Sequence, residues 1–190
     1  MVTRENAFKI LDELGNSPNM LKHALACGFA MRALARKLIT HPSVLKTAEG
    51  NWEIVGLLHD ADYELTDKSL ELHTEETTKK LKEIKANQLI IDAIRGHCDK
   101  VPRQTLMAKA IYAADELTGL IVACALVQPD KKLTTVSVQS VVKKFKDKSF
   151  ARGANRDQIK TCESELKIPL EEFISLTLSA MQNHAGELGL

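Results

Sequence analysis

Six imidazole and carboxylate side chains recur along the first two thirds of the sequence, and together they could bind metal ions. The segment GLLHDAD, residues 56–62, places His59 and Asp60 side by side directly after an apolar run. Polar groups at the mouth of a core need partners, because an unpaired buried charge is costly. Imidazole and carboxylate hold borderline divalent ions, so a metal ion is the partner we expect. The full series is His23, His59, Asp60, His73, His97 and Asp115.

Each of these residues also has an ordinary interpretation when it is taken alone. A single His on a helix is more often a hydrogen-bonded core or surface residue than a ligand, and an HD dipeptide by itself is a weak indication. The series is a stronger indication, because its members fall in order on five successive segments that we expect to be helical. We therefore interpret the series as one metal site.

The elements that must position these residues are helices. Nearly every segment repeats its apolar residues at helical spacing, and no run shows the sustained alternation of a strand. Ser17 and Asn155 are suited to cap two of the helices, and residues 61–70 are expected to be irregular. The sequence predicts an all-α bundle with the metal site between helices. The expected helices cover residues 3–14, 18–38, about 51–60, 70–84, 88–97, 103–127, about 138–145, 155–166 and about 169–186.

Length and composition favour one soluble globular domain over residues 1–190. We expect a motif-bearing core at about 17–127, with C-terminal helices at 136–187 packed on it. The chain has 44% hydrophobic and 27% charged residues, which argues against both a disordered and a membrane protein. A net charge of +1 implies no general affinity for nucleic acid or anionic lipid.

Two further observations concern the location of the protein and its thiols. The start MVTRENAFKI carries charges where a signal peptide would have its apolar core, and the longest apolar run, residues 120–127, is far too short to span a membrane. We therefore expect a cytoplasmic protein. The four cysteines form no CxxC pair, so we expect isolated reduced thiols that are poor candidates for metal ligands or nucleophiles.

The order His23, His59-Asp60, Asp115 resembles the H...HD...D signature of the HD-domain metal-dependent phosphohydrolase superfamily. The likeness covers roughly residues 17–127 and includes the lead-in GLLHD and the segment AADELTGL around Asp115. His73 and His97 resemble the additional pair of the two-metal members, H...HD...H...H...D.

This resemblance implies that His23, His59, Asp60 and Asp115 bind one metal ion, and that Asp60 also bridges to a second ion held by His73 and His97. The ions would be divalent transition metals, one or two per chain, and Mn, Fe, Co, Ni and Zn all suit such ligands. The implied activity is hydrolysis of a phosphate ester by a metal-activated water. No GxSxG elbow, P-loop or Cys-His pair points to another nucleophile.

Residues outside the ligand series complete the predicted site. Asp62 could orient a ligand His or a metal-bound water, so we group it with Asp60 as catalytic, although a helix cap or a solvated acid is an equal alternative. A basic stretch over residues 143–156 is more often a solvated helix face, yet it could gather phosphate oxygens. The candidates for binding substrate at the rim of the cleft are Lys143, Lys148 and Arg152.

We therefore expect a phosphatase or phosphodiesterase that acts on a nucleotide or another small phosphate ester. The segment HDAD has Asp62 where many relatives carry glycine, and the sequence lacks the glycine-tyrosine-proline signature of the cyclic dinucleotide phosphodiesterases. Two alternatives stay open: an HD-type di-iron oxygenase, whose ligands are similar, and a non-catalytic nucleotide-binding module. The sequence leaves the oligomeric state undetermined, and nucleic acid is not an expected partner.

Overall fold

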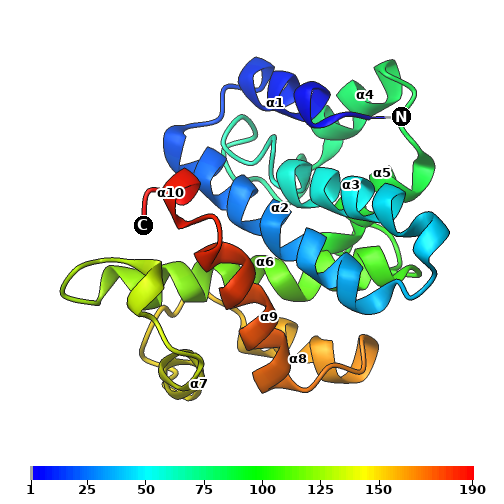
Figure 1. The fold of residues 1–190 in the computed structure, drawn as a ribbon. Coiled ribbons are helices and arrows are strands. Elements are labelled where there is room, and N and C mark those ends of the chain that lie inside the picture. Colours follow the sequence, from blue (N-terminus) through cyan, green and yellow to red (C-terminus); the bar gives the residue numbers. More distant parts are fainter. Residues whose placement is uncertain (1) are drawn as a thin grey trace.

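The computed structural model describes residues 2–190, and within them ten α-helices and one 3-10 turn form, with no strand (Figure 1). The predicted all-α fold is confirmed. None of the described helices has the length and apolar content needed to cross a membrane. The elements are α1 (Arg4–Glu13), α2 (Pro18–Leu38), α3 (Pro42–Leu58), α4 (Glu75–Glu83), α5 (Gln88–His97), α6 (Leu106–Leu126), η1 (Leu133–Thr135), α7 (Val138–Lys146), α8 (Arg156–Glu165), α9 (Leu170–Gln182) and α10 (Ala185–Leu188).

The two longest helices, α2 and α6, pack against each other and organise the rest of the bundle. Helix α3 packs along α2, and α5 packs on α6 and α3. The C-terminal helices α7, α8 and α9 gather around the other side of α6, with α9 also packed on α2 (Figure 1). A site between α2, α3, α5 and α6 is therefore held by helices that are packed on several sides.

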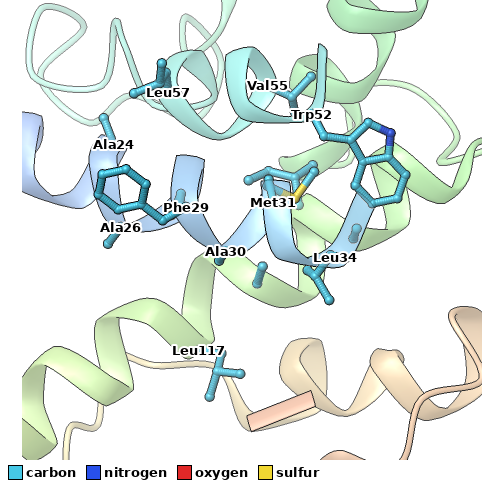
Figure 2. Packing of buried hydrophobic residues seen from close by; sticks show 14 of the residues in the cluster. Ala24, Ala26, Phe29, Ala30, Met31, Leu34, Trp52, Val55, Leu57 and Leu117 are labelled. Atoms are coloured by element: carbon cyan, nitrogen blue, oxygen red, sulfur yellow. The ribbon is translucent and has the colours of Figure 1, made fainter. Parts of the chain in front are cut away.

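The core is continuous between α2, α3 and α6. Figure 2 shows Met31 and Leu34 of α2, Trp52 and Val55 of α3 and Leu117 of α6 among these buried side chains, which are at most 4% exposed. Burial of such side chains is the main favourable contribution to folding. The core thus fixes the relative positions of the three helices.

The backbones of α2 and α3 lie close together at Gly56. A Cβ atom at this position would lie 2.6 Å from the carbonyl carbon and oxygen of Cys27 on α2. Only glycine permits this separation of the two backbones. The same residue begins the segment GLLHDAD, so the close approach lies one turn before His59.

The local sequence explains where the principal helices begin. Ser17 accepts a hydrogen bond from the Met20 amide at the start of α2, and Asn155 accepts two from the first turn of α8. Both caps agree with the sequence prediction. Helix α6 begins at Leu106 instead of Arg103, because the Thr105 side chain accepts from the Ala108 amide and caps the helix there.

Two predicted boundaries in the first half of the chain are wrong. Helix α3 begins at Pro42 instead of about residue 51, because proline is favoured at the first helical position. Helix α4 begins at Glu75 instead of Leu70, and residues 59–74 form mainly successive turns. His73 therefore lies on a turn and not on a helix.

Candidate metal centre

Four side chains from α2, α6 and the turn that follows α3 converge at the first half of the candidate site. His23 lies in the second turn of α2, His59 caps the C-terminal end of α3, and Asp115 lies midway along α6. The Nε2 atoms of His23 and His59 are 3.2 Å apart, and the Asp115 Oδ1 atom is 3.1 Å from the first and 3.4 Å from the second. Asp60 Oδ2 lies 3.6 Å and 3.7 Å from the same two nitrogens. We call His23, His59, Asp60 and Asp115 the first ligand set.

A second group lies against the other oxygen of Asp60. The Nε2 atoms of His73 and His97 are 3.1 Å apart, and each lies 3.2 Å from Asp60 Oδ1. His97 comes from the last turn of α5, whereas His73 comes from the turn that precedes α4. We call Asp60, His73 and His97 the second ligand set. Asp60 is common to both sets and directs one oxygen to each.

Hydrogen bonds made by the Nδ1 atoms determine which nitrogen of each imidazole ring faces the site. His59 Nδ1 donates to the Gly56 carbonyl at 2.9 Å, and His97 Nδ1 donates to the Ile94 carbonyl. A carbonyl oxygen can only accept, so Nδ1 carries a proton, and whenever the ring is neutral its bare Nε2 lone pair faces the site. His73 Nδ1 likewise donates to the Asp62 carboxylate at 2.9 Å.

Bare nitrogens and carboxylate oxygens this close repel one another unless positive charge lies between them. Divalent ions or protons are the two sources of that charge, and they compete for the same Nε2 atoms. The donor set of imidazoles and carboxylates, with its rings oriented from behind, therefore fits the divalent transition metals. One ion would be held by the first ligand set and another by the second.

The pKa directions reflect this crowding of opposite charges. Burial alone would lower the pKa of His59, but the neighbouring Asp60, Cys27 and Asp115 outweigh it and raise that pKa well above its usual value. The pKa values of His23 and His73 are raised in the same way against burial. Burial would raise the pKa of Asp60, but the surrounding imidazoles hold it well below its usual value, and the pKa of Asp115 is also depressed.

Asp62 is fully buried and makes three hydrogen bonds. Besides His73, it accepts from the backbone amides of Thr74 at 2.8 Å and Thr77 at 3.0 Å. The Thr74 side chain makes no capping bond at the start of α4, so Asp62 takes that role from a distance along the chain. Asp62 therefore caps α4 and also orients the His73 ring, and it is not a solvated acid. Its contribution to catalysis stays a prediction.

Two cysteines that sequence analysis set aside lie beside the ligand sets. Cys27 Sγ is 3.8 Å from His23 Nε2, and candidate ligand atoms of Cys27, His23, His59 and Asp115 all lie within 4.8 Å of one another. The candidate ligand atoms of Cys98, His73 and His97 likewise lie within 4.8 Å of one another. The spacing of His23 and Cys27, four residues apart on one helix, was a signal that could have found the first of them. Burial would raise the pKa of Cys27, yet His23 and His59 lower it to about 7.

A cavity of about 780 Å³ opens over both ligand sets. Its walls include Tyr63, Tyr112, Glu116 and Gln158 beside the ligands themselves, and the segment 151–155 closes one side. Glu116 accepts a hydrogen bond from the Asn155 amide at 2.8 Å, and Gln158 donates to the Tyr112 carbonyl at 2.8 Å. These bonds attach the start of α8 to α6, so the C-terminal part of the chain supplies one wall of the cavity.

The three predicted substrate-binding cations are not among the residues that line this cavity. Lys143, Lys148 and Arg152 are absent from the described lining, although Ala151 and Gly153 on either side of Arg152 belong to it. The guanidinium of Arg156 donates to the carbonyls of Ala151 and Ala154 at 2.6 Å and so holds the conformation of the segment 151–155. The role of the three cations in binding substrate stays a prediction.

The two remaining histidines lie outside both ligand sets. His41 is exposed, precedes Pro42 at the start of α3 and hydrogen-bonds to Ser43 at 2.8 Å. His184 stacks on Phe29 at 3.8 Å between ring centroids. This contact forms because the C-terminal segment packs back on α2.

Comparison with known proteins gives one match. Residues 20–120, more than half of the chain, match the family model described as HD domain. The comparisons with curated proteins and with solved structures gave no match. The matched range contains all six residues of the two ligand sets.

Proposed function

The chain belongs to the HD domain family, and from this premise we propose that it is a metal-dependent phosphohydrolase that acts on a nucleotide or another small phosphate ester. The observation that carries the proposal is the shared carboxylate. Asp60 directs Oδ1 to His73 and His97 and Oδ2 to His23 and His59. Two ligand sets that share one residue would hold two ions side by side, as in two-metal phosphoester hydrolases.

Divalent ions in these sets would supply Lewis acidity toward phosphate oxygens and a water of lowered pKa as the nucleophile. The chain itself contributes orientation. The backbone carbonyls of Gly56 and Ile94 and the carboxylate of Asp62 hold three of the four imidazoles with Nε2 toward the site. No side-chain nucleophile is then required, which agrees with the absence of a serine or cysteine elbow from the sequence.

The remainder of the substrate would lie in the cavity above the ligand sets. A volume of about 780 Å³ falls within the range of pockets for small molecules, about 300–1,000 Å³. Tyr63 and Tyr112 offer aromatic surfaces, and Asn155 and Gln158 are neutral polar residues of the same lining. A ring with hydrogen-bonding edges, such as a nucleobase, suits this lining, and a long basic groove for nucleic acid is not among its features.

We also propose that Lys143, Lys148 and Arg152 approach the phosphate from the rim when substrate enters. Arg152 is the best placed of the three, since both of its neighbours line the cavity. Replacing it with Ala should raise KM for a phosphate ester far more than it lowers kcat, because the interaction is with the bound phosphate and not with the reacting atoms. An unchanged KM would exclude this role.

The experiment for the proposed function combines elemental analysis of the purified protein with a phosphate-release screen of nucleotides under added Mn²⁺ or Co²⁺. We expect up to two ions per chain and release of phosphate that His59→Ala abolishes. One ion per chain would instead restrict His73 and His97 to contacts with substrate or structure. Oxygen uptake that requires reduced iron, with no phosphate released from any ester, would overturn the proposal in favour of a di-iron oxygenase.

A further inference from the structure

The sulfur of Cys27 lies among the donors of the first ligand set. Its side chain has no solvent exposure, and Sγ lies beside the His23 ring, 3.8 Å from Nε2 and 4.0 Å from Nδ1. Ligand atoms that share one ion lie about 3–4 Å apart, since metal–nitrogen and metal–sulfur bonds are about 2.1 and 2.3 Å long. The sulfur is therefore at a separation from His23 that two ligands of the same ion would have.

The backbone of Cys27 is fixed where α2 and α3 cross. Its carbonyl group is the one that the missing Cβ of Gly56 would contact at 2.6 Å, so α3 lies directly against this residue. Cys27 also follows His23 by four residues on α2, which places both side chains on one face of the helix. The position of the sulfur thus follows from packing that the core maintains.

The polar surroundings of the sulfur explain how its proton is held without an ion. Thr118 donates its hydroxyl proton to the Asp115 carbonyl at 2.8 Å. The Thr118 oxygen, 3.2 Å from Cys27 Sγ, is then free to accept the thiol proton. This proton would leave to solvent on metal binding, as it does at other thiolate ligands, and the sulfur would exchange a weak hydrogen bond for a metal bond.

We propose that Cys27 is a thiolate ligand of the ion held by the first ligand set, which therefore selects Zn²⁺, Fe²⁺ or Co²⁺ over Mn²⁺ and Mg²⁺. Sulfur ligands favour the softer ions, whereas the nitrogen and oxygen donors of the second ligand set accept harder ones. The assignment rests on the proposed metal centre but is independent of the substrate. It makes the two ion sites chemically unequal.

Cys98, beside the second ligand set, is the competing thiol. Its Sγ donates to the Arg95 carbonyl at 3.5 Å and lies 4.0 Å from the Thr74 hydroxyl. This thiol therefore has a backbone acceptor of its own, and its closest polar contacts are with Arg95 and Thr74 and not with a ligand imidazole. The geometry favours Cys27 as the thiolate that binds metal.

Titration of the metal-free protein with Co²⁺ tests the assignment, because a thiolate bound to Co²⁺ gives a charge-transfer band in the near ultraviolet. We expect this band in the wild type and in Cys98→Ser, and its loss in both Cys27→Ser and Cys27→Ala. Cys124→Ser is the matched control, since Cys124 is also buried but lies nine residues after Asp115, about 13 Å along α6. Competition with a chromophoric chelator should show Zn²⁺ affinity reduced at least about tenfold in Cys27→Ser, with Mn²⁺ affinity nearly unchanged.

The outcomes separate this inference from the proposed function. Co²⁺ that binds the wild type without the charge-transfer band overturns the role of Cys27 and leaves the metal centre intact. A band that disappears only in Cys98→Ser overturns it as well. Absence of any Co²⁺ binding overturns both the inference and the proposed function. The wild-type spectrum requires no substitution, so a variant that fails to fold does not prevent the test.

Discussion

Replacing Gly56 with Ala should both destabilise the protein and weaken its metal binding. The added Cβ would lie 2.6 Å from the Cys27 carbonyl and from the Gly28 amide nitrogen, where ordinary contacts begin at about 3.4 Å. All three atoms are backbone, so no side chain can rotate away. Helices α2 and α3 must instead separate by about 0.8 Å.

The cost follows from this overpacking. Forcing extra volume into a packed core costs about 1–3 kcal/mol, while alanine within a helix gains up to ~1 kcal/mol over glycine. A net loss of about 1–2 kcal/mol would lower the melting temperature by about 2–8 °C in a chain of this length. The same displacement moves His23 away from His59. The Nε2 atoms of the two residues are 3.2 Å apart in the wild type. Functional sites tolerate shifts of only about 0.5 Å, so we expect metal affinity to fall at least about tenfold.

Gly50→Ala provides a matched control on the same helix. No atom lies within 4 Å of its would-be Cβ, and the position is exposed. This variant should gain up to ~1 kcal/mol of stability from helix propensity and keep the wild-type metal affinity. Thermal melts and chelator competition on both variants make the comparison. A Gly56→Ala protein as stable as the wild type, with unchanged metal affinity, would refute the account of the α2–α3 contact.

Three further predictions concern the ligand sets. Asp62→Asn should lower the free energy of unfolding by about 1–3 kcal/mol and weaken metal binding at the second ligand set about 10–100-fold. An amide cannot accept all three of the hydrogen bonds that reach this carboxylate. Loss of stability with intact affinity for two ions would show that Asp62 only caps α4. A chelator should lower the melting temperature, since ions bind the native state and not the unfolded chain, and His59→Ala should abolish this response. The response should persist in His41→Ala, whose imidazole is exposed and distant from the ligand sets; an identical wild-type melt with and without chelator would contradict an ion-binding site. The gain in melting temperature on adding Zn²⁺ should grow from about pH 6 to about pH 8. The raised pKa values of His23, His59 and His73 stabilise the ion-free fold below about pH 6.5, and this contribution is lost as the pH rises through the folded-state pKa values. Deprotonation also frees the Nε2 atoms for the ion, so a gain that shrinks with pH would contradict competition between protons and metal.

The amino-acid sequence predicted the helical fold and the family from local information. Helical spacing of apolar residues, the caps at Ser17 and Asn155 and the order of the histidines and acids are all readable within short windows. Predictions from short segments of sequence were wrong at the starts of α3 and α4. The third helix was predicted to begin near residue 51 although Pro42 opens it, and a helix was predicted from residue 70 where turns occur. Helix propensity alone only weakly predicts where a helix begins, and tertiary contacts such as the cap that Asp62 supplies to α4 determine the boundary.

The identity of the candidate ligands was therefore present in the sequence, but their environment was not. Only the folded chain brings His59 to Cys27 and His23, turns Asp62 toward His73 and brings the start of α8 onto Glu116 as a wall of the cavity. These contacts join residues far apart in the chain, and they depend on how closely α2 and α3 pack at Gly56 and on where α6 crosses them. Residue type and spacing determine which atoms can donate to a metal; the distances between those atoms are determined by the packing of the whole core, which no short segment encodes.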